Sequence, residues 1–395
     1  MMNVLIADSV EQELIAGLEA MGATVDYKPE LNAETLPKAI GAASVLIVRS
    51  TAVTAEAIKA GPRLSLIVRA GAGVNTIDLK AASARGTYVA NCPGMNTAAV
   101  AELAMGLMIS ADRGIPDATH ALRAGKWDKK RIGNARGLKG RTLGIVGTGQ
   151  IGTAVARRAH AFEMRVIAWS RNLNPKKAEA LGAECMPTLT ELARRSDVVS
   201  VHLALAPETK NIFNKAFFDA MKPGAIFINT ARGEVVDHAA LSDAIAAKGL
   251  KVGLDVFDAE PTAGQAPFEQ TALVAKISGT PHIGASTDQA SMAIAMETLE
   301  IIRNFKQTGR PTNIVNIRKA LGCQNTLIIR HYNRVGVLAR VLEILREEGI
   351  NIEEMQNLIF QTNEAACCSL AMDTAPSPTA LQKLKADKDI IEVLV

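Results

Sequence analysis

The sequence contains few cysteines, and they are scattered along the chain. The five residues are odd in number and show none of the paired spacings of zinc sites: Cys92, Cys185, Cys323, Cys367 and Cys368. This pattern argues against a structural zinc and is typical of a protein kept in a reducing cytoplasm. We therefore expect a cytoplasmic protein without a metal site.

The chain also lacks a long apolar run, a basic leader and a strong excess of charge. The longest apolar stretch, residues 97–111, is interrupted by Glu102, so no membrane span is expected. The first residues, MMNVLIADS, form a strand pattern rather than an export signal. A formal net charge of +4 is too small to imply a nucleic-acid partner.

What the sequence does contain is an alternation of short apolar runs and helical patterns. Its 395 residues suggest two or three domains. Near-continuous apolar runs predict parallel strands that are covered on both faces. A first series comprises Val4–Ala7, Val45–Val48 and Leu66–Val68, and a second series comprises Leu143–Val146, Arg165–Trp169, Val198–Val201, Ala225–Asn229 and Val252–Val256. The fold class is therefore α/β with two doubly wound parallel-sheet lobes.

Two segments separate these parts of the chain. A long apolar helix, about Thr97 to Asp112, is placed to join the two lobes, and Gly309 and Pro311 within residues 307–316 predict a linker. After the linker the pattern changes to β-α-β-β-α-β, which predicts a small ferredoxin-like domain.

A glycine-rich loop opens the second series of strands. GIVGTGQIG, residues 144–152, follows a predicted strand and precedes a predicted helix. This context favours a dinucleotide site: Gly147 permits a tight turn, Gly149 lets phosphates approach and Gly152 allows close helix packing. The pyrophosphate would lie at the helix N-terminus. The plainer alternative is a tight turn that binds no ligand.

Three further segments resemble the D-isomer-specific 2-hydroxyacid dehydrogenases. They are INTARGEVVD (228–237), GLDVFDAEP (253–261) and TPHIGAST (280–287), supported by RAGAGVNTIDL and NCPGMNTAAVAELAMGLM nearer the start. The resemblance covers nearly all of residues 1–316, and the remainder resembles an ACT domain, a small-molecule sensor. It implies a discontinuous substrate-binding domain (1–97 and 285–316), an inserted NAD(P)-binding Rossmann domain (98–284) and an ACT domain (322–395).

The residue types in these segments suit the oxidation of a 2-hydroxy acid. His282 is the candidate base, because an imidazole titrates near neutral pH. Glu260 would orient the imidazole and favour its protonated form. Arg232 can hold a carboxylate with two parallel hydrogen bonds. Taken singly, each residue has a plainer interpretation: a structural histidine, a turn residue and a surface ion-pair partner.

The resemblance also implies the residues that contact the cofactor and the substrate. The expected cofactor contacts are Gly147, Gly149, Gln150, Ile151, Gly152, Ser170, Arg171, Thr230, Ala231, Arg232, Asp255, His282 and Gly284. The expected substrate contacts are Arg49, Arg69, Gly71, Ala72, Gly73 and Asn96. Arg49 and Arg69 each end a predicted strand, where two cations would suit a substrate that bears a phosphate. The alternative is an exposed charge at a strand end.

The end of the second strand leaves the choice of dinucleotide open. Ser170 stands about where a carboxylate would accept the ribose 2′-hydroxyl in an NAD-specific site, and Arg171 follows it. Ser170 cannot repel a 2′-phosphate, and Arg171 can pair with one or stack on adenine. We expect NAD to be the cofactor, with NADP also accepted.

The C-terminal domain carries a potential effector site. His331, Asn333 and Asn351 match positions at which ACT domains of related enzymes bind serine at their interfaces. Val335 replaces the proline usual before Gly336, so the turn has lost a rigid residue. The alternative is a domain that only holds a tetramer together.

A dehydrogenase core followed by an ACT domain implies a function within the family. The expected reaction is reversible hydride transfer between NAD(P) and the C2 hydroxyl of 3-phospho-D-glycerate, the first step of L-serine biosynthesis. The main alternative is an NADPH-using hydroxypyruvate or glyoxylate reductase, and a further one is a non-catalytic protein that senses dinucleotides. We expect a homodimer or homotetramer, with a small-molecule substrate and L-serine as an effector.

Overall fold

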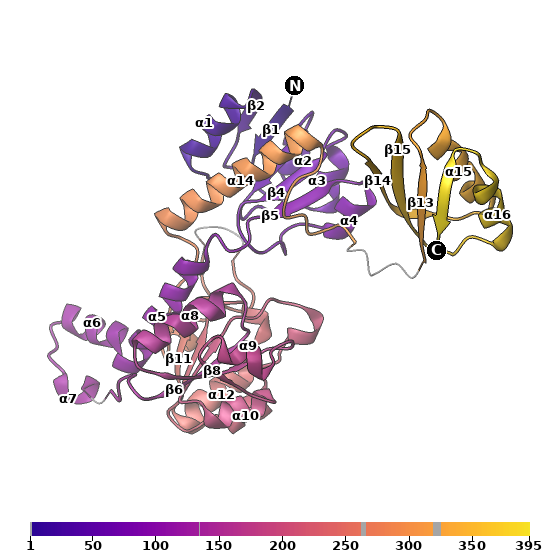
Figure 1. The fold of residues 1–395 in the computed structure, drawn as a ribbon. Helices are drawn as coiled ribbons and strands as arrows, with labels where there is room; N and C mark the ends of the chain where they lie inside the picture. Colours follow the sequence, from indigo (N-terminus) through magenta and orange to yellow (C-terminus); the bar gives the residue numbers. More distant parts are fainter. Residues whose placement is uncertain (1, 134, 262–265, 319–324) are drawn as a thin grey trace. The chain divides into compact units, whose positions relative to one another are not determined.

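The chain folds into two compact units. The computed structural model describes residues 2–133, 135–261, 266–318 and 325–395 (Figure 1). The units are Met1–Asn316 and Ile317–Val395. No helix in the described part of the chain has the length and apolar character needed to cross a membrane. The expected start of the C-terminal domain at residue 322, and Cys323, lie outside the described residues.

The first unit begins with a five-stranded parallel sheet of order β2-β1-β3-β4-β5. Its strands are β1 (Met2–Ile6), β2 (Ala23–Tyr27), β3 (Val45–Val48), β4 (Leu66–Arg69) and β5 (Tyr88–Asn91). Buried side chains of α1 (Gln12–Ala20) and α14 (Asp288–Thr308) cover one face. The other face packs against α2 (Leu36–Ala39), α3 (Ala55–Ala60) and α4 (Leu79–Ala84). Apolar side chains on both faces of these strands explain why they read as continuous apolar runs.

A second, seven-stranded parallel sheet has the order β12-β11-β10-β9-β6-β7-β8. Its strands are β6 (Thr142–Val146), β7 (Arg165–Trp169), β8 (Ala183–Cys185), β9 (Val198–Val201), β10 (Ile226–Asn229), β11 (Lys251–Leu254) and β12 (Ser278–Gly279). The helices α5 (Thr97–Arg113) and α8 (Gln150–Ala161) cover one face, and α10 (Leu189–Arg195), α11 (Lys215–Ala220) and α12 (His238–Lys248) cover the other. The strand order reverses at β6, which is where such sheets bind ligands.

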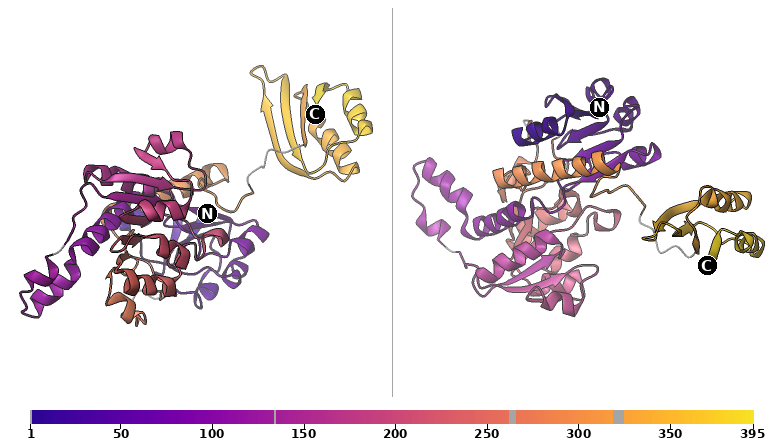
Figure 2. Two further views of the ribbon diagram at one scale, coloured as in Figure 1. Left: turned by 90° about the horizontal axis from the view of Figure 1, so that it is seen from below. Right: turned by 45° about the horizontal axis from the view of Figure 1, so that its top comes forward.

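Shorter helices complete this unit. They are α6 (Ile115–Arg123), α7 (Lys129–Ile132), α9 (Pro175–Glu179) and α13 (Thr271–Val274). The segment with α6 and α7 projects from the rest of the unit (Figure 2). It exposes the large apolar side chains of Ile115, Leu122 and Trp127.

The segment predicted as a linker is largely part of the first unit. The helix α14 does end at Thr308, because Gly309 adopts the left-handed conformation with φ 73°. The residues that follow, however, return to β5: Val315 N–H donates to Val89 O at 2.8 Å, and the Asn316 side chain accepts from Val89 N–H at 2.8 Å. Residues 313–316 are therefore packed on the first sheet rather than forming a linker, as their expected assignment to the substrate-binding domain requires. Backbone hydrogen bonds to a sheet edge are not visible in a Gly/Pro pattern.

The second unit has the predicted β-α-β-β-α-β order. Its antiparallel sheet has the order β14-β15-β13-β16, with β13 (Asn325–Tyr332), β14 (Ile352–Ile359), β15 (Ala365–Met372) and β16 (Ile390–Leu394). Buried side chains of α15 (Val337–Glu347) and α16 (Pro378–Ala386) join those of the strands in one core.

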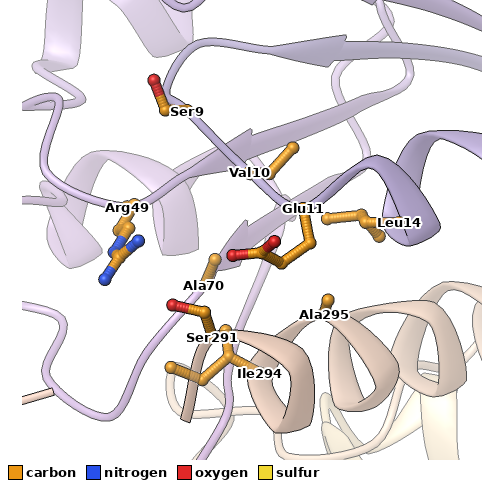
Figure 3. Close-up of a pocket in the computed structure, with 9 residues that line it drawn as sticks. All are labelled: Ser9, Val10, Glu11, Leu14, Arg49, Ala70, Ser291, Ile294 and Ala295. Carbon is orange, nitrogen blue, oxygen red and sulfur yellow. The ribbon is translucent and has the colours of Figure 1, made fainter. Parts of the chain in front are cut away.

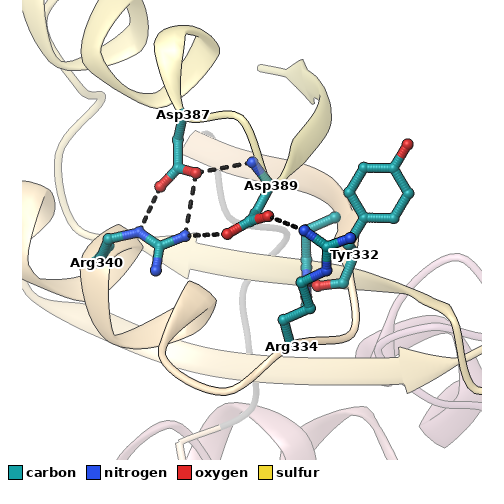
Figure 4. Close-up of polar contacts among 6 residues, drawn as sticks. Tyr332, Arg334, Arg340, Asp387 and Asp389 are labelled. Atoms are coloured by element: carbon teal, nitrogen blue, oxygen red, sulfur yellow. Dashed lines mark hydrogen bonds and ion pairs between the residues drawn. The ribbon is translucent and has the colours of Figure 1, made fainter.

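Ion pairs hold two turns of this unit together. Arg334, in the turn after β13, contacts Asp389 at 2.7 Å, and Arg340 on α15 contacts both Asp387 at 2.6 Å and Asp389 at 2.8 Å (Figure 4). The guanidinium of Arg334 also lies 5.0 Å from the centre of the Tyr332 ring. These contacts link the turn after β13 and the helix α15 to the segment between α16 and β16.

Candidate active site

Charged side chains from three neighbouring strands of the second sheet collect at its carboxyl edge. Arg232 follows β10, Glu260 follows β11 and His282 follows β12. Because β10, β11 and β12 are adjacent and parallel, their ends open onto the same edge. The structure therefore brings the three predicted catalytic residues into one region.

His282 and Glu260 form a direct pair. Nδ1 of His282 lies 2.6 Å from Oε2 of Glu260, while Oε1 of Glu260 accepts from Phe257 N–H at 2.9 Å. Burial by itself raises the pKa of the Glu260 carboxyl, but the hydrogen bonds from His282 and Phe257 outweigh it, so the pKa lies below its usual value. The side chain of His282 is 48% exposed, and its Nε2 has no hydrogen-bond partner among the described residues. The free nitrogen is thus available to a ligand.

Asp255 holds the turn that carries His282. Its carboxylate is 1% exposed and accepts from Thr280 Oγ1 at 2.7 Å, Ile283 N–H at 2.8 Å and Gly284 N–H at 2.9 Å. Burial raises the pKa of Asp255, although these hydrogen bonds act in the opposite direction. Both of its oxygens and the Gly284 N–H are thus already engaged. The predicted contacts of Asp255 and Gly284 with the cofactor would be additional to this role.

Arg232 is held by a residue that sequence reasoning missed. Asn229, the last residue of β10, donates to Arg232 O at 2.8 Å and accepts from Ala231 N–H at 2.9 Å. The guanidinium Nη1 donates to Ala231 O at 2.6 Å, and Nη2 lies 2.3 Å from the position that a Cβ on Gly73 would occupy. Arg232 therefore reaches the predicted substrate loop, and a side chain at residue 73 would displace its guanidinium from this position. The sequence could have pointed to Asn229, because it is a polar residue at the end of an otherwise apolar strand.

A second arginine, Arg69, ends β4, and its guanidinium lies against the loop that follows this strand. Gly71 has φ 151°, and a Cβ there would lie 1.6 Å from Arg69 Nη1. Burial lowers the pKa of Arg69 to about 10, and the charges of Arg232 and Arg49 act in the same direction. The Nε atom of Arg69 is buried without a hydrogen-bond partner in the described structure. The backbone N–H of Gly71 donates to Arg69 O, whereas no acceptor is found in the described residues for those of Ala72 and Gly73.

Arg49 is positioned by an acid that the sequence analysis did not single out. Oδ2 of Asp8, after β1, accepts from the N–H groups of Arg49 at 2.7 Å, Ser50 at 3.1 Å and Thr51 at 3.0 Å. Three consecutive donors on one oxygen immobilise the backbone that carries Arg49. The side chain of Arg49 then lines a small pocket with Glu11 (Figure 3). The sequence could have pointed to Asp8, because it is an acidic residue directly after the first predicted strand.

The glycine loop has the geometry that a dinucleotide requires. Gly147 has φ 96°, and a Cβ there would lie 2.3 Å from His202 O. A Cβ on Gly152 would lie 2.0 Å from Gly147 O, so the helix packs directly on the loop. Among the described residues, nothing lies within 4 Å of the corresponding position on Gly149, and no side chain caps α8. The helix N-terminus is therefore open to a pyrophosphate, and these residues fit that group.

The remaining predicted contacts lie around this loop. Ser170 and the exposed Arg171 follow β7, the strand next to β6. The side chain of Gln150 lies against Gly94: its Oε1 is 2.3 Å from the position that a Cβ on Gly94 would occupy. The loop that precedes Asn96 therefore contacts the start of the helix after the glycine loop. Thr230 is buried, and its Oγ1 lacks a partner in the described residues.

The predicted effector residues do not meet within one chain. His331 is 2% exposed, and its nitrogens lie 2.8 Å from Tyr332 O and 3.3 Å from Asn357 Oδ1. The strand register places His331 opposite Ala366 at one end of the sheet, while Asn351 precedes the other end of β14. Seven residues of strand separate these ends by roughly 20 Å. Asn333 is exposed and donates to Asn363 O at 3.0 Å.

Comparisons with known proteins show to which family this chain is related. A family model for the D-isomer specific 2-hydroxyacid dehydrogenase, NAD binding domain, matches residues 105–284. D-3-phosphoglycerate dehydrogenase of Methanocaldococcus jannaschii is 38% identical over 320 residues, which are 80% of this chain and 60% of that protein. Hydroxypyruvate reductase of Thermotoga maritima is 40% identical over 305 residues, which are 76% of this chain and 96% of that protein. The chain spans about three fifths of the length of the D-3-phosphoglycerate dehydrogenases of M. jannaschii and Archaeoglobus fulgidus.

Solved structures show the same relationship. The crystal structure of the TT0316 protein from Thermus thermophilus has a TM-score of 0.72 and 33% identity, and the match covers 80% of this chain and 100% of that chain. The NAD⁺-bound 3-phosphoglycerate dehydrogenase of Entamoeba histolytica has a TM-score of 0.67 and 28% identity, and the match covers 80% of this chain and 99% of that chain.

Proposed function

Because this chain belongs to the family of D-isomer-specific 2-hydroxyacid dehydrogenases, which are NAD(P)-dependent oxidoreductases, we propose that it oxidises the C2 hydroxyl of 3-phospho-D-glycerate to 3-phosphohydroxypyruvate, reversibly. The observation that carries this proposal is the His282–Glu260 pair, 2.6 Å apart, on the same sheet edge as Arg232. The D-3-phosphoglycerate dehydrogenases among the relatives support the choice of substrate.

In the proposed reaction, each residue has a separate task. The free Nε2 of His282 takes the proton from the C2 hydroxyl, and Glu260 stabilises the resulting imidazolium. Arg232 holds the substrate carboxylate and stabilises charge on the C2 oxygen. The N–H groups of Ala72 and Gly73 offer further donors to the carboxylate. The glycine loop would hold the dinucleotide, which would supply the hydride acceptor for C2.

Steady-state assays of the purified protein test this proposal. NADH oxidation should be measured with phosphohydroxypyruvate, hydroxypyruvate and glyoxylate as alternative substrates. We expect the highest kcat/KM for phosphohydroxypyruvate. A hydroxypyruvate or glyoxylate reductase is the second candidate, because the Thermotoga maritima relative is a hydroxypyruvate reductase and is matched over almost its whole length. A higher kcat/KM for either unphosphorylated substrate would favour that candidate.

Arg49 should discriminate between phosphorylated and unphosphorylated substrates. Its guanidinium makes no hydrogen bond within the described residues, so a phosphate can use it fully. In Arg49→Gln, we expect kcat/KM for phosphohydroxypyruvate to fall by about 10- to 100-fold, because a charge-assisted hydrogen bond is worth roughly 1.5–3 kcal/mol. The value for hydroxypyruvate should fall far less, because a neutral hydroxyl loses a weaker hydrogen bond than a phosphate does. Equal losses for both substrates would remove Arg49 from phosphate recognition.

NAD is the cofactor expected for this domain, and the turn after β7 should allow NADP as well. Ser170 carries no charge to repel a 2′-phosphate, and the exposed Arg171 follows it. Ser170→Asp should therefore raise the ratio of kcat/KM for NAD over NADP by about tenfold, because it places a negative charge near the phosphate. If the wild-type enzyme already rejects NADP by several orders of magnitude, another acid performs the discrimination and this interpretation of Ser170 is wrong.

We also propose that the second unit is a ferredoxin-like ACT domain that binds L-serine between two copies of the chain. Two copies are needed because His331 and Asn351 lie at opposite ends of one sheet. Calorimetry should show serine binding that disappears in Asn333→Ala, since Asn333 is exposed at the turn. If the wild-type protein binds no serine at millimolar concentration, the domain has an architectural role instead.

The domain boundaries and the assembly belong to the same proposal. We assign residues 1–97 and 285–316 to substrate binding, because α14 packs on the first sheet, and residues 98–284 to the nucleotide. A homodimer or homotetramer would cover the exposed Leu122 and Trp127 of the projecting segment. Sedimentation of the purified chain tests the assembly.

A further inference from the structure

The pocket at the carboxyl edge of the first sheet is lined by two side chains of opposite charge that do not pair with each other. Arg49 follows β3, and Glu11 immediately precedes α1 (Figure 3). Within the described ranges, neither the Arg49 guanidinium nor the Glu11 carboxylate takes part in a hydrogen bond or an ion pair. Both charges are therefore left for a ligand.

The local structure keeps these charges where they are. The three N–H groups bound to Asp8 fix the backbone of Arg49. Glu11 is the N-cap residue of α1 but its side chain makes no capping bond, and its carboxylate points into the pocket between Arg49 and Ser291. The rest of the wall is mostly apolar, with contributions from Val10, Leu14, Ala70, Ile294 and Ala295.

This pair of charges treats a phosphate and a hydroxyl differently. A phosphate dianion accepts hydrogen bonds from Arg49, but it is repelled by a carboxylate on the same pocket wall. A hydroxyl can accept from the guanidinium and donate to the carboxylate, so it satisfies both groups. Ala70 lines this pocket and directly precedes the Gly71–Gly73 loop. When the carboxylate of a short substrate binds to that loop, the other end of the substrate can reach the pocket.

We propose that Glu11 is a specificity-determining residue of the substrate site, whose carboxylate disfavours a phosphate on the third carbon of the substrate and favours a hydroxyl there. The inference rests on the proposed function, because it places the C3 end of the substrate beside Arg49. The enzyme accordingly accepts hydroxypyruvate alongside phosphohydroxypyruvate, and Glu11 limits its preference for the phosphorylated compound.

Glu11→Gln tests this inference, with Glu13→Gln as the matched control. Glu13 undergoes the same change of charge in the first turn of α1 but does not line the pocket. At low ionic strength, the ratio of kcat/KM for phosphohydroxypyruvate over hydroxypyruvate should rise about tenfold in Glu11→Gln, since removing one charge at about 5 Å in a partly exposed site is worth about a factor of ten. The change should lie mainly in KM, and added salt should reduce the difference between wild type and variant.

The outcomes separate this inference from the proposed function. A wild-type protein that reduces neither substrate would contradict the proposed function and the inference with it. An active enzyme in which Glu11→Gln leaves the ratio unchanged would overturn the inference alone. An equal rise in Glu13→Gln would also overturn it, because the effect would then come from the overall charge of the helix. Thermal melting of each variant shows whether the fold is retained.

Discussion

Replacing His282 by alanine should reduce kcat about 10²–10⁴-fold, the usual contribution of a general acid–base group. The dinucleotide Kd should change little, because the imidazole is the proposed proton acceptor and the glycine loop holds the pyrophosphate. Steady-state turnover and a dinucleotide binding titration of His282→Ala measure these two quantities.

A matched control separates catalysis from stability. His160 lies on the surface of α8 and contacts Leu181 O at 3.0 Å, away from the carboxyl edge of the sheet. His160→Ala should retain nearly full turnover. If His282→Ala also retained most of its turnover, with phosphohydroxypyruvate at saturation, another group would have to donate the proton to the C2 oxygen.

Replacing Arg232 by glutamine should lower kcat/KM about 10²–10³-fold, as removal of one donor to a developing oxyanion does in other enzymes. The loss is expected in both kcat and KM, because the guanidinium binds the carboxylate and stabilises the C2 oxygen. Arg232→Lys keeps the charge but not the planar pair of donors, so it should recover only part of the activity.

The structure explains why lysine should not suffice. The Arg232 fork is fixed at one side by Ala231 O and lies against Gly73, so its two nitrogens have defined positions. An ammonium group is a single point on a flexible stem. Wild-type kinetics in Arg232→Lys would show that only the charge is used and that the fork geometry has no role.

Much of the architecture was predictable because the interior strands bury both faces. Val45–Val48, Arg165–Trp169 and Val198–Val201 were predicted with the bounds that the structure has. The strands β2 and β8 were missed, since they are edge strands with exposed or polar positions and do not form a continuous apolar run. The two-residue strand β12 is too short to leave a pattern.

For the candidate site, the sequence predicted the charged residues but not the groups that position them. Arg232 and Glu260 follow the buried strands β10 and β11, and the ends of parallel strands meet at one edge of a sheet. His282 follows the short strand β12 and was predicted from its motif. The groups that position them were not foreseen. Asp8 and Asp255 accept hydrogen bonds from backbone that is distant in the sequence. Asn229 bonds to a local turn that a strand pattern does not reveal.

The fold class and the context of the glycine loop could be predicted from the sequence, because apolar periodicity is a local property. The catalytic residues were predicted from the resemblance of short motifs to a known family, and their chemistry suits that assignment. Three features became apparent only in the folded chain: residues 313–316 pair with β5, His331 is buried, and Asn351 lies at the other end of its sheet. It alone placed Glu11 and Arg49 on one pocket wall without pairing. These outcomes depend on which segments meet across the fold, and such contacts are set by the packing of whole sheets and helices.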